Sequence, residues 1–379
     1  MKFIINKWKQ FHYRRSSLYI LFALIVGISI FFVYNNYSFY DRTIAKVIDT
    51  HIEDSEEIID RNQNKDYLYS QSIIAELKNG ERKGQEIYLN NQYSASGAYD
   101  QEFQVGNDLF VSIEENSIKS SQLTGDILGV KRDKYLVIVA WVFIFTLLLV
   151  GKKQGLYSII SLGINIIIIS YALDVYIHTA NISLLWVCAI SVILFTVITL
   201  LLVNGVNEKT YAAIVATLVG TFLSQLITYL VMVFTSESGL YYEGMGFLTR
   251  SPYVVFIAGL FIGSLGAVMD VAVTMSSSIY SLYEKNNNIS IQALKKSGLE
   301  IGKDIMGTMT NILFFAYIGG TIPILILSLK NGSLVSYTFS INLSLELTRA
   351  LAGGIGIVLT IPIGLYTALL FIHWKRERT

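Results

Sequence analysis

The feature that most constrains this chain is a set of eight long apolar stretches. About 20 apolar residues in a helix cross the hydrocarbon core of a bilayer, where every backbone polar group must be bonded internally. Each stretch is therefore predicted to be a transmembrane helix, and the seven that follow residue 134 would form a membrane core over 135–372. The stretches are approximately 18–34, 135–150, 156–176, 183–203, 211–234, 253–280, 305–329 and 348–372.

The composition excludes the common classes of soluble enzyme. Only 15% of the 379 residues are charged, whereas soluble domains have about 25%. The single cysteine, Cys188, rules out a disulfide framework, and the four histidines are too scattered for a zinc site on one helix. No phosphate-binding loop, nucleophile elbow or dinucleotide-binding signature occurs. We therefore expect no enzymatic activity, no metal, no cofactor and no nucleic-acid partner.

The positive charges of the short loops predict the orientation in the membrane. Fifteen Lys and Arg residues lie on one side of the predicted spans, and only Arg250, Lys330 and Arg349 lie on the other. Because positive loops stay in the cytoplasm, residues 1–17 and 373–379 are expected to be cytoplasmic. The first stretch, 18–34, is interpreted as a retained anchor helix, and residues 35–134 are then expected to lie outside the cell membrane.

The segment 35–134 is long and polar enough to form an external domain, with 18 acidic and 11 basic residues. Ile44, Ile48, Ile52 and Ile59 recur at helical spacing, which predicts an amphipathic helix over residues 44–59. The acidic residues around them lack the spacing of a calcium-binding loop, so a solvated face is favoured over a metal site.

From Tyr69 onward the apolar period changes to two. Runs 71–77 and 85–89 are predicted to form a hairpin with a tight turn at Asn79-Gly80, and 108–113 a further strand. We expect an α+β domain that contains a small β-barrel or sandwich. Such a domain could bind a ligand, or it could equally be a spacer or a subunit contact.

One carboxylate lies deep inside a predicted span. Gly259, Gly263, Gly266 and Asp270 fall on one helical face, at i, i+4, i+7 and i+11. The small residues allow a neighbouring helix to approach, so this face is expected to pack against protein. An acid at this depth is costly unless it is protonated, paired or hydrated, which favours a proton- or cation-handling role for Asp270. The alternative is a neutral Asp that ties two helices together.

The next two spans supply further candidates. Asp304, Thr308 and Asn311 share one face, and Asn311 is expected to approach the depth of Asp270. These residues could form a polar path beside the carboxylate, or they could simply hydrogen-bond between helices. Gly353 and Gly354 interrupt the eighth span, where they would allow close helix packing or local mobility.

Three stretches carry a resemblance to a known family. GLFIGSLGAVMDV from Gly259, GKDIMGTMTN from Gly302 and RALAGGIGIVLTIPI from Arg349 resemble the YibE/F-like family of bacterial membrane proteins, of the longer type with an external domain. The likeness runs from about residue 72 to 363. It implies an integral protein of the bacterial cell membrane, with the bilayer and a second related membrane chain as candidate partners, and it implies no reaction.

A weaker similarity is to the SecD/SecF proteins. Asp270, Glu284, Thr310 and Asn311 match their pattern of an intramembrane acid followed by a cytoplasmic turn and a Thr/Asn-bearing helix. The departure is that seven predicted helices follow the external domain here, instead of five.

These observations predict a mainly α, polytopic membrane helix bundle with an extracytoplasmic α+β domain. The expected function is that of a transporter or export-assisting component, coupled to protons or cations through Asp270. The alternative is a non-transporting sensor or assembly scaffold whose external domain binds a partner. The sequence names no substrate.

Overall fold

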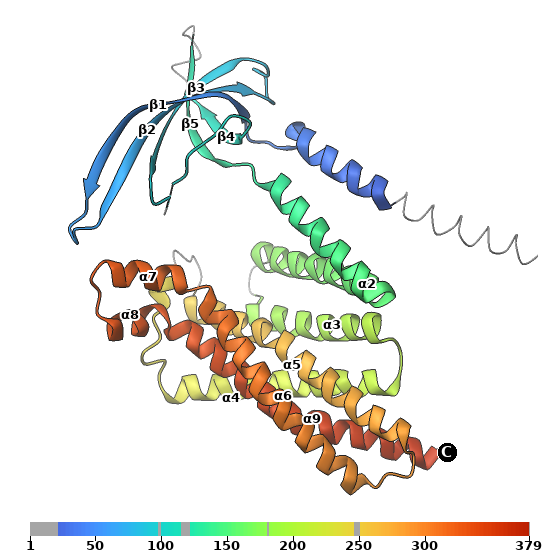
Figure 1. The fold of residues 1–379 in the computed structure, drawn as a ribbon. Coiled ribbons are helices and arrows are strands. Elements are labelled where there is room, and N and C mark those ends of the chain that lie inside the picture. The colour runs from blue at the N-terminus through green and yellow to red at the C-terminus, as the bar shows by residue number, and fades with distance from the viewer. Residues whose placement is uncertain (1–21, 98–99, 115–121, 180–181, 246–250, 379) are drawn as a thin grey trace, which may run out of the picture. The chain divides into compact units, whose positions relative to one another are not determined.

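The computed structural model describes residues 22–97, 100–114, 122–179, 182–245 and 251–378 (Figure 1). The chain divides into an N-terminal unit, Met1–Leu147, and a helical unit, Leu148–Thr379. The boundary falls inside the long helix α2 (Asp133–His178), so each unit is described by itself.

The N-terminal unit is built around one five-stranded mixed sheet. Its strand order is β1-β2-β3-β5-β4, β3 and β5 run parallel, and β4 returns to pair with β1. The sheet therefore curls round a buried apolar interior, although the β1–β4 and β3–β5 ladders are only three residue pairs long. The elements before α2 are the helix Phe22–Asn35, η1 (Tyr37–Phe39), β1 (Ile44–Ile59), β2 (Lys65–Leu77), β3 (Glu86–Ser94), β4 (Asp108–Ile113) and β5 (Leu123–Val130).

The predicted amphipathic helix over residues 44–59 is wrong, because this segment is strand β1. It pairs along its length with β2, and bulges between Val47 and Asp49 and between Ile52 and Asp54 shift its register. β-Branched residues favour the extended chain, and pairing with β2 satisfies the backbone groups that a helix would have bonded locally.

The predicted hairpin between residues 71 and 89 is confirmed, but its tight turn is not. Eight residues, 78–85, separate β2 from β3. Asn79 is buried and bonds to the segment that precedes β1 instead of forming a two-residue turn. Its side-chain oxygen accepts from the Ile44 N–H at 2.6 Å, and its amide nitrogen lies within 3.1 Å of the Tyr37 and Tyr40 carbonyls. The predicted strand 108–113 is confirmed as β4.

A buried lysine joins the sheet to the helices that flank it. Lys131 is 1% exposed, and its Nζ lies 2.8 Å from Asp133 Oδ1 and donates to the Val33 carbonyl at 2.9 Å. The same ammonium lies 5.4 Å from the Tyr37 ring centroid and 5.6 Å from that of Tyr40. Because Val33 is in the helix Phe22–Asn35 and Asp133 begins α2, this cluster fixes both helices to the end of β5.

The helical unit contains most of the apolar helices. Among the described residues of the whole chain, five helices are long and apolar enough to cross a membrane, or six if a bent pair counts as one span. The unit comprises the rest of α2, α3 (Leu184–Asn204), α4 (Glu208–Phe234), η3 (Tyr242–Met245), α5 (Pro252–Lys285), α6 (Ile291–Gly319), α7 (Ile322–Lys330), α8 (Val335–Asn342) and α9 (Ser344–Arg378).

The expected eight spans exceed the five to six candidate spans of the described residues, a count that takes α2 as one helix. Two predicted spans, 135–150 and 156–176, both lie within α2, which consists of two helices that meet at a kink at Lys152, with φ 49° and ψ −119°. The predicted span 305–329 divides into α6 and α7, bent by 52° beside Gly319, Gly320 and Pro323. The predicted span 18–34 lies partly outside the described residues, and the helix described there, Phe22–Asn35, is short.

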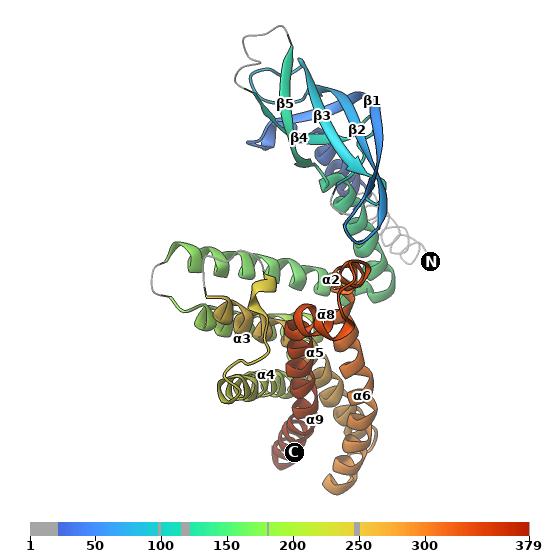
Figure 2. The ribbon, with the colours of Figure 1, turned by 90° about the vertical axis from the view of Figure 1, so that its left-hand side faces the viewer.

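Helix α9 packs against α4, α5 and α6 (Figure 2). Glycines allow this close approach: a Cβ at Gly356 would lie 2.8 Å from Val268 Cγ2 of α5 and 3.1 Å from Ser224 Oγ of α4. Ser224 Oγ also donates to the Ala352 carbonyl at 2.8 Å. The buried core of the unit therefore centres on α9.

Candidate functional site

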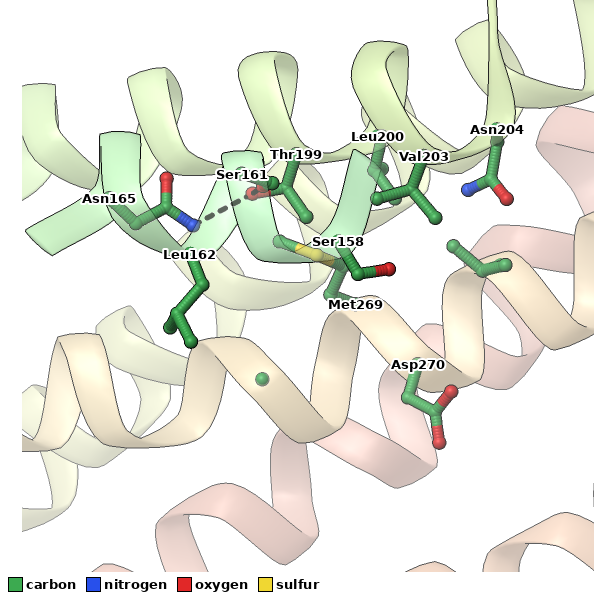
Figure 3. A pocket seen from close by; sticks show the side chains of 12 residues that line it. Ser158, Ser161, Leu162, Asn165, Thr199, Leu200, Val203, Asn204, Met269 and Asp270 are labelled. Atoms are coloured by element: carbon green, nitrogen blue, oxygen red, sulfur yellow. Dashed lines mark hydrogen bonds between the residues drawn. The ribbon is translucent and has the colours of Figure 1, made fainter. Parts of the chain in front are cut away.

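An open, partly polar pocket lies between α2, α3 and α5 of the helical unit (Figure 3). Its volume is about 400 Å³, and apolar side chains such as Leu162, Leu200 and Val203 form part of its wall. A pocket of this kind is the usual form of a small-ligand site in a helix bundle. The polar residues that line it are Ser158, Ser161 and Asn165 of α2, Thr199 and Asn204 of α3, and Asp270 of α5.

Helical periodicity brings these side chains to the pocket. Ser158, Ser161 and Asn165 are spaced i, i+3 and i+7, so they project from one face of α2. Asn204 is the last residue of α3, which ends at Gly205 with φ 77°, a conformation that glycine adopts without strain. The polar residues of the pocket thus come from one face of α2 and, at Asn204, from the C-terminal end of α3.

Three side chains form a hydrogen-bond network across the α2–α3 contact. Ser161 Oγ and Asn165 Nδ2 both donate to Thr199 Oγ1, each at 2.9 Å (Figure 3). Asn165 Oδ1 is buried and accepts no hydrogen bond within the described chain. Since buried polar atoms are nearly always paired, this network has capacity for a further donor, such as water or a bound solute.

Asp270 lies on the α5 wall of the pocket. Its side chain is exposed in the helical unit, and it forms no hydrogen bond or ion pair within the described residues. Figure 3 shows its carboxylate pointing away from Asn165 and Thr199. The carboxylate therefore lines the same pocket as the α2–α3 network but points away from it.

The glycine face that leads to Asp270 is only partly covered. A Cβ at Gly263 would overlap the Tyr317 hydroxyl of α6, so the predicted close approach of a neighbouring helix occurs here. A Cβ added at Gly259 or at Gly266 would meet no described atom within 4 Å, and both residues are exposed. In the described chain this face of α5 is therefore open on both sides of Gly263.

The predicted α6 residues share one exposed face but are not bonded to Asp270. Thr308 Oγ1 donates to the Ile305 carbonyl of its own helix at 3.0 Å. Asp304 and Asn311 are also exposed, and no side-chain hydrogen bond joins either of them to Asp270 in the described structure. The polar path expected beside Asp270 is thus not connected by direct contacts.

Gly353 and Gly354 lie buried in α9 where it faces α6. A Cβ at Gly353 would overlap Leu313, and one at Gly354 would lie 3.6 Å from Thr310 Cγ2. Glycine thus provides room for α6 at this crossing.

Apart from the Met269 thioether, the polar groups that line the pocket are hydroxyls, carboxamides and one carboxylate. A carboxylate with hydroxyls and carboxamides can exchange protons with water or coordinate a hard cation. No group of three or more His, Cys, Asp or Glu side chains that could hold a metal ion occurs among the described residues.

The sequence singled out Asp270, which lines this pocket, but not the hydrogen-bond network of α2 and α3. The available signal was the polar face of residues 158, 161 and 165 inside an otherwise apolar span. Its significance depends on Thr199 of a different helix, and pairing between helices is not visible in a single sequence.

Five to six candidate membrane spans, preceded by a β-rich unit, define a multi-pass membrane protein. Residues 139–374 match the YibE/F-like protein family, and residues 38–130 match the YibE/F family N-terminal domain. The chain belongs to the YibE/F family, as its sequence motifs indicated. No curated protein and no solved structure matches it significantly.

Proposed function

We propose that this protein is a membrane transporter or an export-assisting component in which Asp270 takes up and releases a proton or a small cation. The observation that carries the proposal is a carboxylate on the wall of an open, partly polar pocket, with no cationic partner among the described residues. Ionisable side chains inside membrane spans are expensive and usually mark ion or proton pathways.

The surroundings of Asp270 support this role. The Ser161–Thr199–Asn165 network retains an unpaired buried acceptor, Asn165 Oδ1, which can bind water in the pocket that Asp270 also lines. Asp304, Thr308 and Asn311 provide a second group of polar side chains on the exposed face of α6. In the proposal they extend the pathway toward the cytoplasmic side.

The orientation and partners form part of the same proposal. The bias of Lys and Arg in the short loops supports cytoplasmic termini and an extracytoplasmic N-terminal unit in the bacterial cell membrane. A second related membrane chain is proposed to cover the open α5 face at Gly259 and Gly266. Small residues at such a face allow the close helix contacts that associate membrane helices.

The alternative function is a non-transporting sensor or assembly scaffold whose external domain binds a partner. The scaffold function is favoured by the N-terminal unit, which is a folded sheet with its own apolar core. A protein that only anchored itself in the membrane would not need such a domain. The scaffold function gives no reason for an unpaired carboxylate on a partly polar pocket, which is why transport is preferred.

The test is replacement of Asp270 in a strain whose loss of this protein gives a measurable phenotype. Asp270→Asn keeps the shape of the neutral acid but cannot release a proton, so it should be expressed normally and fail to restore the phenotype. Asp174→Asn is the matched control, because Asp174 is exposed near the end of α2 and contacts His178. The control should restore the phenotype fully.

A direct readout accompanies this complementation. Infrared difference spectra of the purified protein, recorded across a pH series, should contain a carboxylic-acid band that Asp270→Asn removes and Asp174→Asn retains. Full complementation by Asp270→Asn at matched expression would exclude proton or cation handling by this residue and would favour the scaffold.

A further inference from the structure

The hairpin of β1 and β2 extends beyond the rest of the sheet as a two-stranded arm (Figure 1). β1 and β2 remain paired as far as Ile59 and Lys65, whereas the ladder between β2 and β3 ends at Leu68. We define the arm as residues 52–69. The sheet core is at its base, and the turn 60–64 is at its tip.

One face of the arm continues the buried face of the sheet. Side chains at alternate positions of β2 point the same way, and their exposure rises along the strand from 0% at Ile73 through 2% at Gln71 to 48% at Tyr67. Ile52, opposite Gln71, is 44% exposed, and Ile59, opposite Lys65, is 56% exposed. We call this the inner face of the arm.

A polar layer closes the sheet core before the arm begins. Gln71 Nε2 donates to the Phe103 carbonyl at 2.7 Å, and Asn91 Nδ2 donates to Gln71 Oε1 at 3.0 Å. Beyond this layer, the rings of Tyr69 and Tyr93 stack with centroids 5.1 Å apart. The apolar residues of the inner face therefore lie outside the core that folding requires, and they remain exposed within the described structure.

The arm is strongly acidic. Between Glu53 and Asp66 there are six carboxylates and two cationic side chains. On the inner face, Glu57 is opposite Tyr67, and its Oε1 lies 3.3 Å from Lys65 Nζ. Glu53, at the bulge beside Ile52, forms no hydrogen bond or ion pair within the described residues. An apolar strip bordered by negative charge is complementary to a segment that carries both apolar and basic side chains.

The backbone edges of the arm are less suited to binding than its face. The N–H groups of Thr50, Ser55 and Tyr67 each donate to the side chain of the preceding Asp, at 2.8 to 2.9 Å. Charged residues and bulges of this kind protect a strand edge from adding another strand. A second copy of the same arm is also disfavoured, because it would bring like charges together.

We propose that the inner face of the arm is a docking surface for a basic, partly apolar peptide segment of another protein. Apolar side chains of that segment would pack on Ile52, Ile59 and Tyr67, and its Lys or Arg side chains would pair with Glu57, which is opposite Tyr67, and with Glu53 at the bulge beside Ile52. An Arg guanidinium could also stack on the exposed Tyr67 ring. This docking is independent of any transport through Asp270.

The test uses the full-length protein in nanodiscs of uncharged phosphatidylcholine, so that the lipid does not attract a cationic probe. The probe is a fluorescent peptide of about ten residues that alternates Arg and Leu, because alternate side chains of an extended chain share one face. Its anisotropy should rise on binding, and added salt should weaken the binding. A peptide that alternates Glu and Leu, and one that alternates Arg and Ser, should bind at least about tenfold more weakly.

Two independent variants localise the binding. Tyr67→Ser with Ile52→Ser removes apolar contacts, and Glu53→Gln with Glu57→Gln removes charges; each pair should weaken binding of the Arg-Leu probe by about tenfold or more. The matched controls are Val105→Ser, an exposed apolar side chain of a different loop, and Glu81→Gln in the β2–β3 loop. Both controls should bind like the unmodified protein, and because all the changed residues are exposed, melting temperatures should stay the same.

Absence of binding, equal binding of the Glu-Leu peptide, or unchanged binding by both arm variants would overturn the proposal. So would a concentration-dependent dimer that the Tyr67→Ser pair abolishes, since the occupant would then be a second copy. None of these outcomes depends on Asp270→Asn, so the docking and transport proposals fail separately.

Discussion

The Lys131 cluster leads to a quantitative prediction for the N-terminal unit. Lys131→Met keeps most of the aliphatic length of the side chain but removes its charge and its donors. The Val33 carbonyl loses its partner from Lys131, which costs about 1–3 kcal/mol for a buried group. The contacts with the Tyr37 and Tyr40 rings contribute roughly 0.5–1 kcal/mol each.

The ion pair with Asp133 adds less than a fully buried pair would, because the Asp133 side chain is 24% exposed and water can replace the ammonium. The expected loss is therefore about 3 kcal/mol in the free energy of opening near the cluster. At 1.4 kcal/mol per factor of ten, amide hydrogen exchange there should accelerate roughly 100-fold.

The assay is hydrogen exchange with mass spectrometry on the full-length protein, read at peptides that cover β4 and β5. Lys83→Met is the matched control, because Lys83 is exposed in the β2–β3 loop. Adding Asp133→Asn to Lys131→Met should recover part of the protection by removing the unpaired charge. Exchange in Lys131→Met within twofold of the Lys83→Met control would refute this account of the cluster.

Two further predictions concern a tyrosine and a pair of glycines. Burial, followed by the charge of Asp108, raises the pKa of Tyr37 from 10.0 to about 12, so its contribution to stability is complete below pH 10 and is lost as the pH rises toward 12. Thermal melts across this range should show a shallower fall for Tyr37→Phe, and an unchanged slope would contradict the assignment. Gly356→Ala should lower the melting temperature, because its Cβ would meet Val268 and Ser224, whereas Gly259→Ala in α5 should leave it unchanged or slightly higher. If both glycine variants lowered the melting temperature equally, the close contact of Gly356 with Val268 and Ser224 would not explain the effect of Gly356→Ala.

The membrane helices were predictable because hydropathy is a local property of the chain. The predicted span 183–203 corresponds to α3, Leu184–Asn204, and 211–234 lies within α4, Glu208–Phe234. The pattern also separated the two helices of α2 that meet at the Lys152 kink, but it joined α6 and α7, which bend at Gly319–Gly320. Apolar content specifies where a helix is stable, but it does not specify where its axis changes direction.

The wrong helix over residues 44–59 has a physical explanation. Ile44, Ile48 and Ile52 are four apart, which suits a helix, but an even spacing also keeps residues on one face of a strand. Two bulges then disrupt the alternation that would have identified the strand. Pairing with β2 decided between the two structures, and that contact is made with residues up to 32 positions away.

The sequence could identify a candidate-site residue only where its polarity differs from that of its neighbours in the chain. Asp270 is an acid within an apolar span, so its position alone singled it out. Ser161, Asn165 and Thr199 are ordinary residues in their own helices and become informative only where α2 meets α3.

The central position of α9 has a consequence for biosynthesis. Helices α4, α5 and α6 all precede α9 in the chain, yet each packs against it. As the ribosome delivers the chain from the N-terminus, these three helices enter the bilayer before the glycine surface that they will share has been made. Gly220 of α4 packs against Thr360 of α9, so this contact cannot form before α9 has been synthesised. Assembly of the helical unit is therefore post-insertional, and a nascent chain that stalls before Ser344 would present an unfinished bundle to membrane quality-control proteases.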